Sequence, residues 1–290
     1  MPELPEVETT VRDLQKKVLK RTFVDVWTDS EKTIKKPSSF EMFRKQIKGK
    51  KILDVWRRGK NILFELSGNK VLLIHQKLTG HLLLGYWILD NGHWKAKIKG
   101  PLEERINIYI HLLFTLDNGE QLALSDLRKF AKVQLWEKEE WEKSEEFKNL
   151  GPEPLERNFT FQKFKECLRG KKKKIKQVLI DQNVIAGIGN IYSDEILWEA
   201  KINSFKETRG LSDDELKRIY KAMKKVLKEA IELKGESISD FRRISGERGF
   251  YDKKRKVYRR EGEKCPRCGT IILRKKIVGR SAHFCPSCQK

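Results

Sequence analysis

Cys265-Pro266-Arg267-Cys268 and Cys285-Pro286-Ser287-Cys288 enclose 16 residues, and these two knuckles decide how the end of the chain folds. Each C-x-x-C turn can direct two thiolates at one metal ion, and the two turns together complete a closed tetrahedral sulfur shell of the structural kind. A segment this short cannot fold on apolar burial alone, so we expect the metal to stabilise it. The alternative, a pair of redox dithiols, lacks the βαβ pattern that accompanies such motifs. The spacing predicts one structural Zn²⁺ in a zinc finger over residues 263–290, with ligands Cys265, Cys268, Cys285 and Cys288.

The stretch between the knuckles, Lys275–Ser281, is expected to form a hairpin turn that carries Arg280 outward. The planar guanidinium of an arginine can grip two oxygens of one phosphate. We therefore take Arg280 as a candidate phosphate contact, with a solvated turn charge as the simpler alternative.

Upstream, Ile185–Tyr192 contains Gly187 and Gly189 between two expected helices. Glycine permits left-handed backbone and close approach of a partner, and the following helix N-terminus offers free amides to a phosphate. No strand precedes the turn, so a nucleotide-binding Gly-x-Gly is disfavoured. A helix–turn–helix unit that contacts the DNA backbone fits better. Asn190 and Lys172, the latter within a run of four lysines, are the candidate phosphate contacts, although most lysine runs are solvated surface.

The charge balance also indicates a polyanionic partner. The 290 residues carry 63 Lys+Arg against 41 Asp+Glu, a formal net charge of +22. The excess is uneven, with 28 basic and 22 acidic residues in 1–150 against 35 and 19 in 151–290. We expect the second half to bind nucleic acid, and a merely basic or ribosome-associated protein is the alternative. The sequence has no apolar run long enough for a membrane span and no secretory signal, and its five cysteines favour the cytosol.

Periodicity predicts an α+β chain with two domains. Apolar spacings of three and four predict a helix over residues 3–20, and short alternating runs up to 136 predict a β-sandwich or barrel. The expected strands are Phe23–Trp27, Lys51–Val55, Asn61–Leu66, Val71–His75, Ile106–Leu116, Gln121–Leu124 and Lys132–Trp136. The expected regions are an N-terminal domain over 1–136, a linker over 137–150, a helical domain over 151–235, a basic mobile loop over 236–262, and the zinc finger.

The first residues, Met1-Pro2-Glu3-Leu4-Pro5-Glu6, are the strongest candidate for chemistry. Removal of Met1 would leave Pro2 with a secondary α-amine, and α-amino groups titrate near ~8, so part of it is nucleophilic at neutral pH. Such an amine can form an iminium with an aldehyde-like carbon. Glu3 and Glu6 are nearby carboxylates that could transfer protons. The simpler alternative is a frayed terminus.

The chain resembles the formamidopyrimidine-DNA glycosylase branch of the formamidopyrimidine-DNA glycosylase/endonuclease VIII family. The matching stretches occur in the expected order along the whole chain. They are Met1–Thr9, Arg57–Lys60, Asp126–Phe130, Gly151–Leu155, Ala186–Tyr192 and Cys265–Gln289. The resemblance implies an N-terminal helix and β-sandwich, then a helix-two-turn-helix domain with a four-cysteine zinc finger. It also implies a base excision repair enzyme, a glycosidase and lyase of damaged double-stranded DNA.

The resemblance also implies residue roles. Pro2 would attack the anomeric carbon, Glu3 would act as general acid, and Glu6 would hold the terminal helix and the amine. Lys60 and Arg280 would grip phosphates in the catalytic centre. Family members fill the space left by the extruded nucleotide with three side chains, which match Leu78, Arg128 and Phe130. The expected DNA-binding residues are His75, Leu78, Arg128, Phe130, Lys172 and Asn190.

Several positions depart from the family pattern. The stretch His75–Gly80 has Lys77 where a small residue is usual and Leu78 where methionine is usual. Leucine is close to methionine in volume, so the wedging role should survive. Ala131 and Arg259 stand where glycine is frequent, and Arg259 lies in the loop that closes over oxidised guanine in relatives. The preferred base is therefore the least constrained expectation.

Three functions follow from these observations. The leading hypothesis is a monomeric, cytoplasmic, nucleoid-associated glycosylase and AP lyase that removes oxidised purines through a Schiff base at Pro2 and β,δ-elimination. The second has the same chemistry on oxidised pyrimidines or abasic sites. The third is a non-catalytic nucleic-acid-binding protein with a zinc ribbon.

Overall fold

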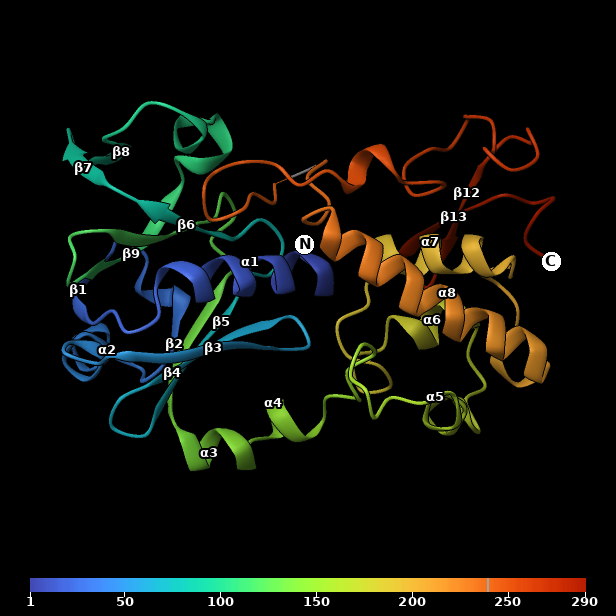
Figure 1. Cartoon of the computed structure of the whole chain (residues 1–290), viewed down its shortest axis with the longest axis horizontal. Helices are drawn as coiled ribbons and strands as arrows, with labels where there is room; N and C mark the ends of the chain where they lie inside the picture. Colours follow the sequence, from blue (N-terminus) through green and yellow to red (C-terminus); the bar gives the residue numbers. More distant parts are fainter. Residues whose placement is uncertain (239) are drawn as a thin grey trace. The chain divides into compact units, whose positions relative to one another are not determined.

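The computed structural model describes residues 1–238 and 240–290, which form two compact units. Unit 1 comprises Met1–Lys148 and Leu233–Phe250, and unit 2 comprises Asn149–Glu232 and Tyr251–Lys290. The predicted α+β class is confirmed, since both helices and sheets are present in the order that the sequence suggests (Figure 1).

Unit 1 is a sandwich of two sheets (Figure 1). The first sheet has the order β1-β9-β10-β6, and its strands are β1 (Phe23–Thr28), β9 (Ile110–Leu116), β10 (Gln121–Ser125) and β6 (His81–Gly85). The second has the order β2-β11-β5-β4-β3, and its strands are β2 (Ile34–Lys36), β11 (Lys132–Glu137), β5 (Lys70–His75), β4 (Asn61–Leu66) and β3 (Ile52–Arg58). Buried side chains from both sheets, such as Phe23, Phe64 and Phe114, share one core. The alternating runs therefore resolve into a sandwich, because each strand buries one face against the other sheet.

Helix α1 (Leu4–Lys17) packs its apolar stripe on this core. Val7, Val11 and Leu14 recur at spacings of four and three, and each is buried in the core cluster. A shorter helix, α2 (Phe40–Ile47), begins at Ser39, whose hydroxyl accepts a hydrogen bond from the Met42 amide at 3.4 Å. The N-terminal helix was predicted over residues 3–20, and the observed helix lies within that range.

Two parts of unit 1 differ from expectation. A hairpin of β7 (Trp87–Asp90) and β8 (His93–Ala96) and two 3₁₀ turns, Pro101–Glu103 and Arg105–Asn107, precede β9, which therefore begins at Ile110 rather than 106. The predicted linker, 137–150, largely forms α3 (Lys138–Lys143) and α4 (Glu145–Lys148). Trp141 of α3 is 2 % exposed and packs with Leu63 and Val71. The sequence did not predict these helices because the segment is mostly charged. A single buried tryptophan, rather than an apolar stripe, packs it on the sheet.

Unit 2 contains the predicted helices. They are α5 (Phe161–Leu168), α6 (Ile175–Leu179), α7 (Asn190–Ala200) and α8 (Asp213–Glu232). A capping box precedes α8, because the Glu215 amide donates to Oγ of Ser212 at 3.3 Å and the Ser212 amide donates to Oε2 of Glu215 at 3.0 Å. The zinc-finger hairpin consists of β12 (Leu273–Ile277) and β13 (Arg280–Phe284).

The segment predicted as one mobile loop, 236–262, is divided between the two units after Phe250. Residues 240–250 belong to unit 1, where Arg242 pairs with Glu104 and Arg243 pairs with Asp13. In unit 2, the backbone amides of residues 256–258 donate hydrogen bonds to the carboxylate of Glu195. Composition alone suggested mobility because the segment is polar and basic, but its arginines have specific partners. Across residues 1–238 and 240–290, no helix has both the length and the apolar character needed to cross a bilayer.

Candidate active site

Pro2 and Glu3 directly precede α1, and the Glu3 amide is bonded to the carboxylate of Glu6. Pro2 is buried and Glu3 is 3 % exposed. The Glu3 amide donates to Oε2 of Glu6 at 2.8 Å, and the second oxygen of Glu6 accepts the Glu236 amide at 2.8 Å. Glu6 is itself 1 % exposed, so its two oxygens bridge two backbone segments away from water. Glu6 thus accepts the amide of the residue that follows Pro2, and its expected role in holding the terminal amine stays a prediction.

Lys60 and His75 lie close together at one end of the second sheet. Lys60 is 7 % exposed in the turn between β3 and β4, where Gly59 has φ +58°. Asn61, the next residue, pairs with His75 across β4 and β5. Burial, together with the charges of Lys77, Lys132 and Lys60, lowers the pKa of His75 to about 3. His75 is therefore a neutral acceptor, and its Nδ1 accepts the Lys77 amide at 2.9 Å.

The three predicted wedge residues lie on two turns that are joined by Asp126. Leu78 lies in the turn between β5 and β6, and Arg128 and Phe130 lie in the turn after β10. Thr79 donates its hydroxyl to Oδ1 of Asp126. The other oxygen of Asp126 accepts the Phe130 amide at 2.7 Å. The structure therefore brings the two predicted turns together within unit 1.

Phe130 is the exposed aromatic residue on this pair of turns. Its side chain is 50 % exposed, and the guanidinium carbon of Arg128 lies 4.7 Å from its ring centroid. An exposed aromatic ring stacked with a cation is suited to insertion between bases. Sequence analysis gave Asp126 no role, although an aspartate that begins a turn commonly accepts amides of the next residues.

In unit 2, Asn190 and the zinc-finger hairpin border one cavity. Asn190 opens α7 directly after Gly189, and among the described residues its Oδ1 has no hydrogen-bond partner. The cavity has a volume of about 610 Å³. It is lined by Asn190, Tyr258, Arg259, Glu261, Arg274, Ser281 and His283. Arg280, next to Ser281, is exposed at the start of β13, as predicted, and Lys172 is exposed but does not line the cavity.

A buried ion pair attaches the hairpin to the helices of unit 2. Lys176 and Asp194 are both fully buried and form a salt bridge. Lys176 also donates to the carbonyl oxygen of Ser281 at 2.8 Å, and Asp194 accepts the backbone amide of His283 at 3.0 Å. The carboxylate also contacts Nδ1 of that histidine at 2.9 Å. Sequence analysis missed these residues because their separation along the chain is large.

The four cysteines fit one tetrahedral zinc ion. Their sulfur atoms lie within 4.8 Å of one another, and Zn–S bonds of about 2.3 Å require sulfurs roughly 3.8 Å apart. Trp198 of α7 donates its indole N–H to Sγ of Cys265 at 3.4 Å. The hydrogen bond orients a ligand sulfur, and the closed four-sulfur set is typical of a structural metal rather than a catalytic one. The predicted ligands, Cys265, Cys268, Cys285 and Cys288, are therefore the set that the structure brings together.

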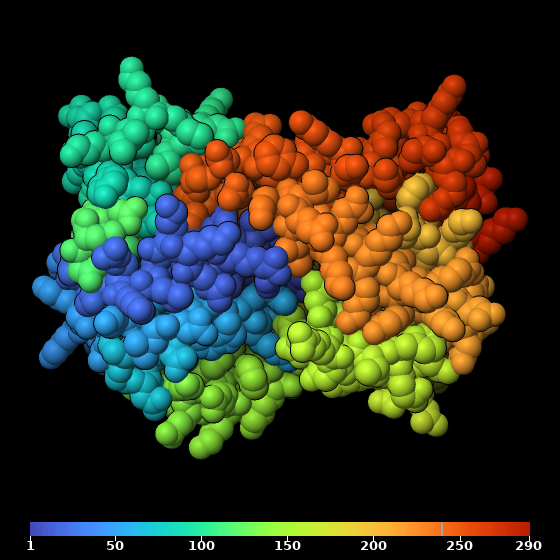
Figure 2. Space-filling model, viewed as in Figure 1, coloured from blue at the N-terminus to red at the C-terminus, as the bar shows by residue number. Residues whose placement is uncertain are grey.

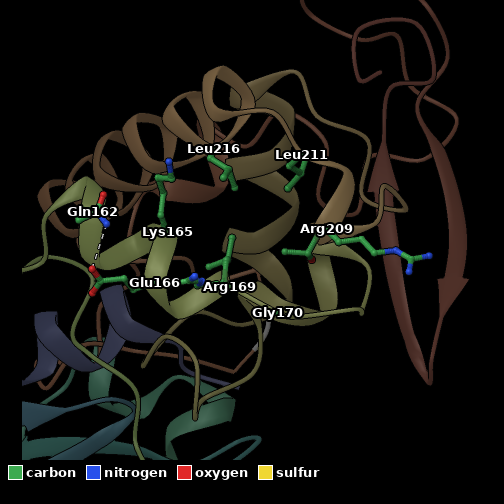
Figure 3. A pocket seen from close by; sticks show the side chains of 10 residues that line it. Gln162, Lys165, Glu166, Arg169, Gly170, Arg209, Leu211 and Leu216 are labelled. Carbon is green, nitrogen blue, oxygen red and sulfur yellow. Dashed lines mark hydrogen bonds between the residues drawn. The ribbon is translucent and has the colours of Figure 1, made fainter.

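A different pocket in unit 2 lies between α5, the turn at 208–211 and the start of α8 (Figure 3). It has a volume of about 460 Å³, and its lining includes Arg169, Leu211 and Leu216 but no residue of the predicted site. The Gln162 side chain donates to Glu166 at 3.2 Å on its wall. We assign no part of the proposed chemistry to it.

Three family models match the chain and together cover most of it. The formamidopyrimidine-DNA glycosylase N-terminal domain matches residues 1–133, the H2TH domain of the same enzymes matches 150–242, and a zinc finger found in FPG and IleRS matches 262–290. A formamidopyrimidine-DNA glycosylase of Pelotomaculum thermopropionicum is 41% identical over 292 residues, covering 100% of this chain and 99% of the relative. The chain belongs to the formamidopyrimidine-DNA glycosylase family.

Other family members also match this chain over their full length in sequence or in structure. A formamidopyrimidine-DNA glycosylase of Carboxydothermus hydrogenoformans is 39% identical and covers 100% of both chains. A Lactococcus lactis FPG mutant, solved in complex with DNA that contains Fapy-dG, superimposes with a TM-score of 0.87 at 34% identity over 100% of both chains. A MutM structure in complex with DNA that contains carbocyclic 8-oxo-G gives a TM-score of 0.86 at 34% identity. The family fold therefore extends over the whole of this chain.

Proposed function

We propose that this chain is a bifunctional DNA glycosylase and AP lyase that removes oxidised purines from double-stranded DNA. The observation that carries the proposal is the start of α1, where Pro2 precedes a Glu3 whose amide is held by a buried Glu6. Relatives named formamidopyrimidine-DNA glycosylase, and structures of relatives with Fapy-dG and 8-oxo-G DNA, support the choice of substrate. A cytoplasmic location near the nucleoid and action as a monomer belong to the same proposal.

The first chemical step would use the α-amine of Pro2 after removal of Met1. The nitrogen lone pair attacks C1′ of the damaged nucleoside, and the bond from C1′ to the base breaks; the base leaves with the bonding electron pair and takes up the proton that the proline nitrogen loses. Glu3 protonates the ring oxygen of the sugar, and opening of the ring leaves an iminium between the proline nitrogen and C1′. Glu3 directly follows Pro2 in the chain and is 3 % exposed, which supports this assignment of the proton transfer to its carboxyl.

The second stage would cleave the DNA strand. The iminium acidifies C2′, and loss of that proton expels the 3′ phosphate by β-elimination. A further elimination expels the 5′ phosphate. Water finally hydrolyses the iminium and regenerates the free amine of Pro2. The four-cysteine zinc site supplies none of these steps, since four thiolates close its coordination shell.

The remaining candidate residues would bind DNA. Lys60, Lys172, Asn190 and Arg280 are assigned to phosphates, since they present cationic or amide donors. His75 would contribute as a neutral donor or acceptor, because its pKa of about 3 keeps it uncharged at neutral pH. Leu78, Arg128 and Phe130 would fill the space that an extruded nucleotide leaves, because their two turns are joined through Asp126.

A product panel tests the proposal. Duplexes that contain an oxidised guanine, a ring-opened purine, an oxidised pyrimidine or an abasic site would be incubated with the processed protein and separated on denaturing gels. We expect excision of both purine lesions and a strand break that carries phosphate on both ends. A preference for pyrimidines would support the second hypothesis, and binding without cleavage of any duplex would support the non-catalytic one. Glu3→Gln should bind lesion DNA but not excise the base.

A further inference from the structure

The segment that follows α8, residues 233–238 and 240–250, packs on unit 1 rather than standing free of it; we call it the return segment. Ile244 is 5 % exposed within the core cluster of the sandwich, and its carbonyl oxygen accepts the Leu84 amide of β6 at 2.8 Å. In Figure 2 the orange-red atoms of the return segment lie against the blue atoms of α1. The return segment is thus part of the body that carries Pro2.

The return segment is closed at its base. The Phe250 amide donates to the carbonyl oxygen of Leu233 at 2.8 Å, and the Gly249 amide donates to Oγ of Ser237 at 2.9 Å. A Cβ atom on Gly249 would lie only 2.2 Å from the carbonyl oxygen of Gly235. No side chain fits there, so the two ends of the segment are held in direct backbone contact.

Two contacts connect the return segment to α1. The Glu236 amide donates to Oε1 of Glu6 at 2.8 Å, and Arg243 donates to both carboxylate oxygens of Asp13 at 3.0 and 3.2 Å. Glu6 and Asp13 are seven residues apart, so the segment grips the helix at two points about two turns apart. The first point is the carboxylate that also holds the Glu3 amide.

Glu104 pairs with two arginines of the return segment, and we call this set of contacts the clamp. Arg242, whose side chain is 4 % exposed, donates Nε and Nη2 to the two oxygens of Glu104 at 2.7 and 2.8 Å. Arg248 donates to Oε1 of the same carboxylate at 2.8 Å. These hydrogen bonds from Arg242 and then Arg248 lower the pKa of Glu104 to about 2. One carboxylate therefore holds two arginines of the segment, one of them buried.

We propose that Glu104 is a positioning residue for the N-terminal amine, acting through Arg242 and the return segment on α1. Loss of the clamp removes the ion pairs of Arg242 and Arg248 with residue 104, and we expect the segment then to hold Glu6 and Asp13 less rigidly. The Glu3 amide loses its rigid acceptor, and Pro2 and Glu3 lose their fixed geometry. Misplacement of a reacting group by about 1 Å can slow a reaction by ~100-fold. The inference rests on the proposed function, since it concerns the amine assigned to the chemistry.

The test compares Glu104→Gln with Glu103→Gln, a neighbouring carboxylate that accepts the Gly100 amide and is exposed. Single-turnover rates on an abasic duplex at saturating enzyme, and Kd for the same duplex reduced at the abasic site, would be measured for both variants and the unaltered protein. We expect Glu104→Gln to slow the reaction between about 10- and 100-fold with Kd changed less than about 2-fold. Glu103→Gln should match the unaltered protein in both quantities.

A second readout needs no activity. Hydrogen exchange of the free protein should show faster exchange of the Glu236 amide and of the first turn of α1 in Glu104→Gln, with the strands β4 and β5 unchanged. If Glu104→Gln does not fold, Arg248→Gln decides the question, because Arg248 is 64 % exposed and its loss leaves the Arg242 pair in place. It should show the same two effects at smaller size.

Two results would overturn the inference: a Glu104→Gln rate equal to that of Glu103→Gln, or unchanged exchange at Glu236 and the first turn of α1. Absence of strand cleavage by the unaltered protein would instead refute the proposed function. The exchange measurement on Glu104→Gln would still decide whether the clamp holds α1.

Discussion

The candidate groups of the two units are held in place by different means. In unit 1, Glu6 and Asp126 are buried carboxylates that accept backbone amides, so each fixes a turn or a helix end within a β-sandwich core. In unit 2, Asn190 and the zinc-finger hairpin depend on the buried pair of Lys176 and Asp194 and on four cysteines. A metal-dependent hairpin and a hydrogen-bonded helix end should respond differently to the same perturbation.

Zinc removal should produce the largest difference. Structural zinc in small fingers contributes on the order of 10–16 kcal/mol of folding free energy, so residues 263–290 should unfold on chelation. We expect DNA affinity to fall at least about 100-fold, because the hairpin carries Arg280 and ordered phosphate contacts dominate binding. Hydrogen exchange should show loss of protection in the hairpin and unchanged protection in α1. Equal loss in both units would contradict the difference between them.

Replacement of Lys176 tests the second support of unit 2. Removal of one partner from a fully buried ion pair costs about 3–5 kcal/mol, because the other charge stays buried. Lys176→Met should lower the free energy of unfolding of unit 2 by that amount, measured by urea titration. Lys172→Met is the matched control, since Lys172 is exposed, and it should change stability by less than about 0.5 kcal/mol. Equal stability of the two variants would mean that the buried pair does not support the hairpin.

His75 should make unit 1 sensitive to acid. Its folded-state pKa is about 3 against 6.5 for the free side chain, so the unfolded state binds the extra proton between these values. The stabilisation is therefore complete above pH 6.5 and is lost as the pH falls towards 3. Between pH 6.5 and 5 the loss is about 2 kcal/mol, at ~1.4 kcal/mol per pH unit.

Denaturant titrations across this range would compare His75→Asn with His93→Asn. The first variant should have a flatter pH dependence of stability, and the second should keep the slope of the unaltered protein because His93 is exposed on β8. Parallel slopes in all three proteins would contradict the lowered pKa of His75, because they would mean that its imidazole binds protons equally in the folded and unfolded states.

Gln76 should produce the smallest effect, and in the opposite direction. It is 1 % exposed, and among the described residues neither its side-chain nitrogen nor its oxygen has a hydrogen-bond partner. A buried amide without partners costs roughly 1–3 kcal/mol, so Gln76→Leu should raise the free energy of unfolding by about 1 kcal/mol. Gln121→Leu is the control and should destabilise, because Oε1 of Gln121 accepts the Trp87 amide at 2.6 Å. A loss of stability in Gln76→Leu would show that the amide is satisfied.

Sequence patterns predicted those parts of the structure that are determined by residues close together in the chain. The C-x-x-C turns, the capping box at Ser212 and the helix that begins with Pro2-Glu3 were all predictable, because each is set by short spacings. The position of the return segment was not, because its partners are distant in sequence; Arg242 and Glu104, for example, are 138 residues apart. Trp141 similarly orders a charged stretch through contacts with distant strands. Such contacts depend on the tertiary fold. The composition of a basic stretch does not show whether its charged side chains have partners elsewhere in the chain.

The proposed chemistry depends on the amine of Pro2, which directly precedes α1. Its most direct test is to reduce the reaction on an abasic duplex with borohydride, digest the cross-linked protein, and find the modified peptide by mass spectrometry. We expect a single adduct on Pro2 of the protein without Met1. Pro2→Gly should be trapped much more slowly, and the protein that retains Met1 should give no adduct. Attachment to a lysine such as Lys60, or equal trapping by the protein with Met1 retained, would contradict it.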